Sequence, residues 1–242
     1  MSFGGRYFVT TALLISSCGY LHSFDGFIPV TPNDLETQST NLYSQVVLMY
    51  TDATRSICTG AVISDHLVLT AAHCRHEGKA SGFYDAAGPK LAESNVSVAP
   101  IGEDPDLALY IFPENTFSLS PLPLAFDAHK NDEVEVIGYG CNDILKETGQ
   151  TTKRLGTNHI LDVFEFITLY TPLLHGGMKV VGSSNTAGLC TGDSGAPLLR
   201  NGAIIGVASI AEVKSDRVYS WYANLNTTPA RNFLRPYLPN IP

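Results

Sequence analysis

Short apolar segments, rich in β-branched and aromatic residues, recur along the chain. Most are bounded by Gly, Pro, Asn or Asp, which is typical of strands that end in tight turns. Such segments are too short for helices of ordinary length and predict an all-β sandwich or barrel. They occupy residues 45–50, 61–64, 67–70, 107–112, 134–140 and 203–210.

A helix is predicted close to the carboxyl end. Thr228 can cap it, Pro229 suits its first position, and residues 230–234 precede a stop at Pro236. The proline-rich stretch 118–126 is the best candidate for a linker between two β halves. A chain of 242 residues, 44% hydrophobic, can bury one core or two small packed ones.

The amino end has the pattern of a targeting segment over residues 1–17, with Arg6 before a short apolar run and small residues after it. The alternative is a lipoprotein box at 15–18, in which Cys18 is lipidated and attaches the chain to a membrane. Residues 18–27 would then be a propeptide or an anchor region. We expect an exported protein, either secreted or periplasmic, or a membrane-anchored lipoprotein.

Charge and cysteine content limit the partners and the compartment. A net charge of −8 argues against nucleic-acid binding. Five cysteines become four if Cys18 is spent at the processing site, which fits two disulfides in an oxidising compartment.

Three segments carry residues suited to attack on an amide carbonyl. That reaction needs a hydroxyl, a base, a group that orients the base, and amide donors for the oxyanion. Ser194 lies in CTGDSGAP, where Gly192 and Gly195 allow a tight turn, His73 ends a strand-like segment in LTAAHC, and Asp106 opens DLALYIF. Each alone is a weak signal, and only the three together carry weight.

These motifs, in the order His, Asp, Ser, closely resemble the chymotrypsin family from about residue 43 to the carboxyl end. Ala196 stands where an α/β-hydrolase would have its second Gly. The resemblance implies two packed antiparallel Greek-key β-barrels, at 28–120 and 121–242, and a serine endopeptidase that needs no cofactor or metal and acts on protein or peptide substrates. We expect a monomer, of bacterial origin.

The resemblance also implies residue roles. Ser194 would be the nucleophile, His73 its base, and Asp106 the group that orients the base. The Gly192 and Ser194 amides would form the oxyanion hole, and Ser209 would support Asp106. The alternative for Ser209 is an ordinary strand residue.

Cys58 and Cys74 match the family's disulfide beside the histidine. The positions of Cys141 and Cys190 are neighbours in the family's fold, so the resemblance implies that these two cysteines form a second pair. A metal site is the rival interpretation, but it lacks the paired spacing of zinc modules. It would use Cys58, His73, Cys74 and His76.

The substrate pocket departs from the trypsin branch, because Gly188 stands where an aspartate would select basic side chains. Ala211 and Ser220 would form the walls, and a neutral pocket favours large apolar or aromatic residues. A shifted register would bring in Arg217 and favour acidic residues, whereas Glu212 beside the pocket would favour basic ones.

Activation is the second departure. Family members free an amino terminus whose ammonium pairs with the aspartate before the serine, here Asp193. This chain has no IVGG string, and Ile28 or Val30 would be the new terminus. A zymogen is therefore expected.

Two other functions stay open. A catalytically silent or zymogen-locked binding protein could share the fold, and an esterase would share the acyl-enzyme step. Asn95 and Asn226 are glycosylation acceptors only if the source is eukaryotic.

Overall fold

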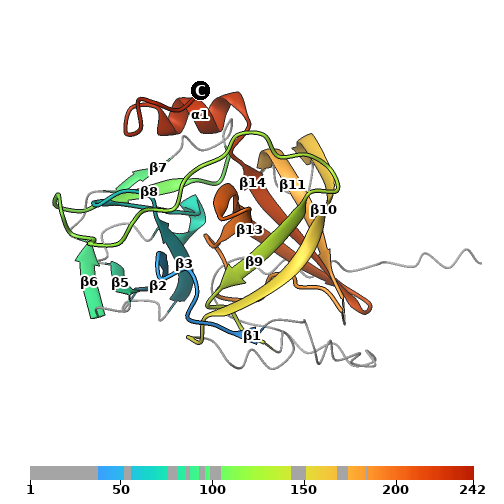
Figure 1. The fold of residues 1–242 in the computed structure, drawn as a ribbon. Coiled ribbons are helices and arrows are strands. Elements are labelled where there is room, and N and C mark those ends of the chain that lie inside the picture. Colours follow the sequence, from blue (N-terminus) through green and yellow to red (C-terminus); the bar gives the residue numbers. More distant parts are fainter. Residues whose placement is uncertain are drawn as a thin grey trace, which may run out of the picture.

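The computed structural model describes residues 38–51, 56–75, 81–85, 88–92, 96–98, 105–142, 151–167, 174–183 and 185–242. Within these ranges the chain forms two seven-stranded antiparallel sheets and one short α-helix (Figure 1). The predictions made for the targeting segment, for Cys18, and for Ile28, Val30, His76 and Asn95 lie outside the described residues.

The first sheet, blue to green in Figure 1, has the strand order β6-β5-β2-β3-β4-β8-β7. Its central strands β3 and β4 pair through Ala61 with Leu69 and Val62 with Val68. Its strands are β2 (Val46–Thr51), β3 (Ser56–Val62), β4 (Leu67–Thr70), β5 (Ser81–Asp85), β6 (Gly88–Ala92), β7 (Val96–Val98) and β8 (Ala108–Ile111).

The second sheet, mainly yellow to red, has the order β1-β10-β11-β14-β13-β12-β9 (Figure 1). A further pairing of β10 with β9 closes it into a barrel. Its strands are β1 (Gln38–Ser39), β9 (Glu133–Gly138), β10 (Arg154–Ile167), β11 (Leu174–Gly182), β12 (Pro197–Arg200), β13 (Ala203–Lys214) and β14 (Arg217–Asn224).

The all-β fold of two antiparallel sheets is confirmed. The closing pairing is seen in the second sheet, whereas the pairings of the first, over its described residues, run in open order from β6 to β7. The strand β1, from the amino-terminal part of the chain, pairs with β10 of the second sheet. The strands β10 and β11 were not predicted from the sequence, because they contain polar residues such as Asn158. Strand β10 pairs with β9 on one side and β11 on the other, and Asn158 donates to Val181 O on β11.

Residues 112–132 connect the sheets and include the predicted linker. This segment is held by backbone hydrogen bonds to both halves, from Leu122 N to Val62 O at 3.0 Å and from Ala125 N to Ile204 O at 2.8 Å. One continuous cluster of buried residues includes members from both sheets, among them Phe83, Tyr110 and Trp221. The two sheets are therefore fixed against one another.

The carboxyl-terminal helix α1 spans Thr228–Leu234 and packs Ala230 and Leu234 into the core. The prediction of Thr228 as its cap is wrong, because Thr227 has the extended backbone of a cap and its Oγ1 accepts from Ala230 N at 3.3 Å. No helix among the described residues is long and apolar enough to cross a membrane.

Candidate active site

His73 and Asp106 come from neighbouring strands of the first sheet. Strand β4 runs antiparallel to β8, with Thr70 opposite Ala108, so the residues that follow β4 and precede β8 meet at one edge. His73 lies on a short 3-10 turn, Ala72–Cys74, directly after β4. A disulfide from Cys74 to Cys58 ties this turn back to β3.

The Asp106 carboxylate connects the two sheets. Its Oδ2 atom lies 2.6 Å from His73 Nδ1, and its Oδ1 accepts from the His73 backbone N–H at 2.9 Å. Ser209, on β13 of the second sheet, donates from Oγ to Oδ2 at 2.7 Å. The Asp106 side chain is 9% exposed and that of His73 is 26% exposed. The imidazole is thus held in one orientation with its other edge open.

This network sets the charges of both groups. Burial by itself lowers the pKa of His73, but the charge and hydrogen bond of Asp106 outweigh it, and the pKa is raised above the ordinary 6.5. Burial raises the pKa of Asp106, yet His73, Ser209 and the backbone bond overcome this effect, and the pKa lies below its usual range. Asp106 is therefore ionised at neutral pH and stabilises a protonated His73.

Ser194 lies on the turn between Cys190 and β12, close to the end of β4. Thr59 N donates to Ser194 O at 2.8 Å, and a side chain at Gly195 would overlap Thr59 O and the Thr70 side chain. Gly195 also has φ +81°, which favours glycine. Ser194 and Ser209 line one cavity. Among the described residues the Ser194 hydroxyl has no hydrogen-bond partner, a geometry common before substrate binds.

Two backbone amides beside Ser194 are free to bind an oxyanion. Gly192 has φ +102°, and its carbonyl oxygen accepts a hydrogen bond from Thr59 Oγ1 at 2.9 Å. With the carbonyl held by Thr59, the N–H of Gly192 does not point toward Thr59. Within the described ranges neither Gly192 N nor Ser194 N has an acceptor. Thr59 also accepts from Tyr139 N at 3.1 Å. Sequence analysis missed Thr59, because nothing in its local sequence distinguishes it from other strand threonines.

Asp193 anchors this turn from the inside. Its carboxylate accepts from Gly140 N at 2.7 Å and from Cys190 N at 2.9 Å. A side chain at Gly138 or Gly140 would overlap this carboxylate. Burial raises the pKa of Asp193 to about 6, against the two backbone bonds and the charge of Arg154, which lower it.

A second disulfide joins Cys141 to Cys190, with the Cα atoms 5.3 Å apart. Cys141 N also donates to Thr191 O at 2.9 Å. Both pairings match those that the resemblance implied. The metal alternative fails, because Cys58 and Cys74 are joined in a disulfide and cannot act as thiolate ligands.

The cavity beside Ser194 includes one of the three predicted pocket residues, Ala211. Gly188 instead lines a separate small cavity with Asp193, and Ser220 is fully buried with its Oγ accepting from Leu189 N at 2.9 Å. The lining residues beside Ser194 are Leu189, Cys190, Thr191, Ser194, Ser209, Ile210 and Ala211. The cavity is therefore small and lined by no charged residue.

The two charged residues considered for the pocket do not line it. Glu212 is 3% exposed and its Oε1 lies 2.9 Å from Lys214 Nζ, so its charge is balanced locally. Arg217 is exposed at the start of β14.

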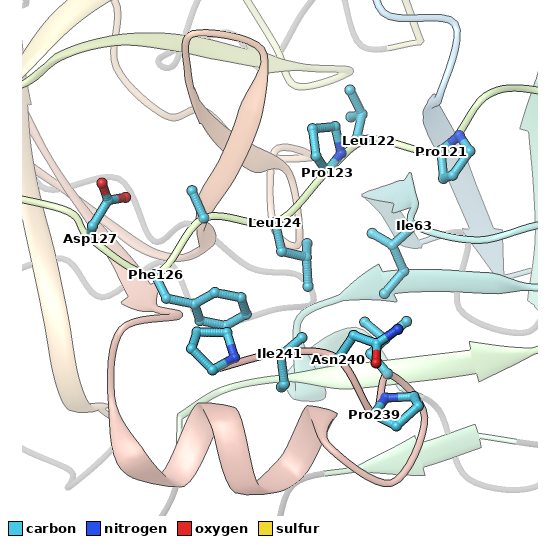
Figure 2. A pocket seen from close by; sticks show the side chains of 13 residues that line it. Ile63, Pro121, Leu122, Pro123, Leu124, Phe126, Asp127, Pro239, Asn240 and Ile241 are labelled. Atoms are coloured by element: carbon cyan, nitrogen blue, oxygen red, sulfur yellow. The ribbon is translucent and has the colours of Figure 1, made fainter.

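A larger hollow lies on another part of the molecule. It is enclosed by Ile63, the linker residues 121–127 and the tail residues 238–242 (Figure 2). It shares no lining residue with the cavity beside Ser194. We place the candidate site at Ser194, because the network of His73, Asp106 and Ser209 lies there and not at this hollow.

Comparison with known proteins agrees with this geometry. A family model described as Trypsin matches residues 34–230. Kallikrein-8 of Rattus norvegicus is 26% identical over 173 residues, which cover 64% of this chain and 66% of the relative. The venom plasminogen activator Haly-PA of Gloydius brevicauda is 27% identical over 187 residues, covering 70% of this chain and 72% of the relative.

Solved structures share the fold. Neuropsin from mouse brain superimposes with a TM-score of 0.64 at 20% identity, covering 79% of this chain and 95% of that one. Human heparin binding protein gives 0.64 at 18% identity, covering 86% and 98%. The chain spans just under two thirds of the length of kallikrein-8.

Proposed function

This chain belongs to the trypsin family, and on that basis we propose that it is a serine endopeptidase. The observation that carries the proposal is the network in which Asp106 joins His73 to Ser209 beside the Ser194 turn. These are the parts that acyl transfer requires: an oriented base, and a hydroxyl and two open amides on a turn that shares a cavity with Ser209.

In the proposed reaction, Ser194 Oγ attacks the carbonyl carbon of the scissile peptide bond and His73 Nε2 takes its proton. The ionised Asp106 stabilises the resulting imidazolium. The 2.6 Å contact between His73 Nδ1 and Asp106 Oδ2 keeps the imidazole in place. His73 then gives the proton to the departing amine, and an acyl-enzyme remains on Ser194. Water enters, is deprotonated by His73, and releases the acid.

The negative oxygen of each tetrahedral intermediate would be bound by Gly192 N and Ser194 N. Donors of this kind lower the barrier by about 2.7–4 kcal/mol each, because they are oriented before the charge develops. Thr59 supports this role by holding the Gly192 carbonyl away from the site.

The cavity beside Ser194 supports an uncharged side chain at the residue before the cleaved bond. Its walls carry no charged residue, so a bound charge would lose its hydration without a partner. Its lining stops short of Gly188 and Ser220, which favours a small or medium apolar side chain over a large aromatic one. Protein and peptide substrates follow from this assignment.

We also propose that the protein works outside the reducing cytoplasm. Its two disulfides fit an oxidising compartment, in accord with an exported protease.

The test is labelling with a fluorophosphonate, followed by hydrolysis of peptide p-nitroanilides ending in Ala, Leu, Phe, Arg or Asp. We expect one adduct on Ser194, no adduct in Ser194→Ala, and an unchanged adduct in the exposed control Ser120→Ala. Ala and Leu substrates should be cleaved at least tenfold faster than those with charged residues.

A wild-type protein without label would contradict the proposal and favour a silent binding protein. Label with ester hydrolysis but no amide hydrolysis would identify an esterase.

A further inference from the structure

Asp193 holds the oxyanion turn in its folded position. It bonds Cys190 N at one end of the turn and Gly140 N on the facing loop, and its own N–H donates to Cys190 O at 3.0 Å. The two residues with the open amides, Gly192 and Ser194, flank it in sequence. A shift of the Asp193 carboxylate would therefore move both oxyanion donors.

The carboxylate is costly to bury. Asp193 is 8% exposed, and among the described residues it has no direct ion pair. Two backbone bonds satisfy part of its charge, and its pKa of about 6 leaves it mostly ionised at neutral pH. The buried Tyr222 hydroxyl cannot balance this charge, because a phenol carries no positive charge. Burial and the charge of Asp193 raise the pKa of Tyr222 well above its ordinary value, so it stays neutral. A nearby cation is needed to balance the site.

Arg154 supplies a positive charge at this place. It lies at the start of β10, opposite Gly138 of β9, and lines the same small cavity as Asp193. Its Nη1 donates to Gly140 O at 3.2 Å and to Thr152 O at 3.2 Å. Gly140 thus accepts from Arg154 through its carbonyl and donates to Asp193 through its N–H, so one residue connects the cation to the anion.

We propose that Arg154 is a positioning residue that keeps Asp193 and the oxyanion turn assembled without a newly freed amino terminus. The inference rests on the proposed function, because it concerns the competence of the same Ser194 site. It accounts for a chain that keeps Asp193 but has no Lys or Arg directly before Ile28 or Val30, where activating cleavage would be expected.

The first test is a double-mutant cycle read by the rate and affinity with which a fluorophosphonate phosphonylates Ser194, a reaction that forms an O–P bond and releases fluoride. Arg154→Gln should lower the limiting rate of phosphonylation roughly tenfold, with little change in reagent affinity, because the oxyanion donors act in the transition state. Arg154→Lys should restore most of the rate. The matched control Arg235→Gln, on the exposed end of α1, should label like the wild type.

Coupling between the two charges distinguishes this role from simple structural support. In an Asp193→Asn background, Arg154→Gln should change the rate by less than about twofold, because the charge to be balanced is gone. Multiplicative effects of the two substitutions, or an Arg154→Gln protein within twofold of the wild type, would overturn the proposal.

The second test needs no substitution and holds even if Arg154→Gln does not fold. Full-length wild-type protein is labelled and its intact mass is measured, which shows where each labelled chain begins. We expect adduct on chains that begin before residue 28. Adduct confined to chains that begin at Ile28 or Val30 would overturn the proposal, whereas no adduct on any chain would instead contradict the protease function.

Discussion

Ser209 donates a 2.7 Å hydrogen bond to the Asp106 oxygen that also holds the His73 imidazole. The bond crosses from β13 in the second sheet to the segment before β8 in the first. Since His73 and Ser194 also come from different halves, this contact fixes how the halves of the site meet.

Ser209→Ala should therefore weaken catalysis without preventing folding. A hydrogen bond to a charged group is worth about 1.5–3 kcal/mol, so we expect kcat to fall by roughly 10–100-fold with KM little changed. Ser209→Thr, which keeps the hydroxyl, should recover part of the loss, and the exposed Ser120→Ala should have none. A Ser209→Ala enzyme with normal kcat would show that Asp106 is oriented without this bond.

The pH dependence should follow the protonation of His73. Only the neutral imidazole can accept a proton, and its pKa is raised by Asp106, so kcat/KM should rise with pH and reach half its plateau above pH 6.5. Asp106→Asn removes the negative charge and should move this midpoint to lower pH, with kcat reduced on the order of 10⁴-fold. A midpoint that does not move would remove Asp106 from the proposed role.

Asp193 should make the protein less stable as pH rises from about 4 to 6. Between its ordinary pKa of 3.8 and about 6, the folded protein keeps a proton on this carboxyl that the unfolded chain releases, so the free energy of unfolding falls. The difference corresponds to about 3 kcal/mol. Urea unfolding at several pH values should show a smaller fall in the free energy of unfolding for Asp193→Asn than for the wild type.

The matched control for that measurement is Asp162→Asn, an exposed residue on β10. It should leave the wild-type pH profile unchanged. An Asp193→Asn profile parallel to the wild type would show that Asp193 ionises normally in the folded state.

The Cys141–Cys190 disulfide should stabilise the fold and the oxyanion turn together. Its cysteines are 49 positions apart, and closing a loop of this size is worth about 4 kcal/mol in the chain-entropy model. Replacing both with Ala should lower the urea midpoint and slow Ser194 acylation, since Cys190 also bonds Asp193.

The Cys58–Cys74 disulfide provides the comparison. Its cysteines are 16 positions apart, and closing this loop should contribute about 3 kcal/mol to the free energy of unfolding. Its removal should mainly affect the turn that carries His73. Equal acylation rates in the wild type and the Cys141→Ala/Cys190→Ala variant would show that the second disulfide does not brace the oxyanion turn.

Much of the fold follows from local patterns. The apolar segments at 45–50, 67–70 and 203–210 overlap β2, β4 and β13, because short apolar runs rich in β-branched residues suit buried strands. The long strand β10 escaped prediction. Its polar residues are accommodated by partners distant in sequence, as when Asn158 donates to Val181 O and Ala187 O.

The pocket shows the same division. The resemblance implied Gly188, Ala211 and Ser220 as pocket residues, and of these Ala211 lines the cavity beside Ser194. Gly188 and Ser220 are not among the residues that line this cavity, and Ser220, on β14, accepts a hydrogen bond from Leu189 N. Contacts of this kind depend on how β14 packs against the segment before Ser194.

By itself the sequence determined the chemical groups of the site. The motifs around His73, Asp106 and Ser194 place the residue types of acyl transfer in a recognisable order, and Gly192 and Gly195 allow the tight turn. Only the tertiary structure decided which charges face one another. It placed Arg154 against Gly140 beside Asp193, because the pairing of β10 with β9 and the bond from Gly140 N to Asp193 bring together residues that are up to 53 positions apart in the chain. The resemblance had already implied the contact of Ser209 with Asp106, and the structure contains that hydrogen bond.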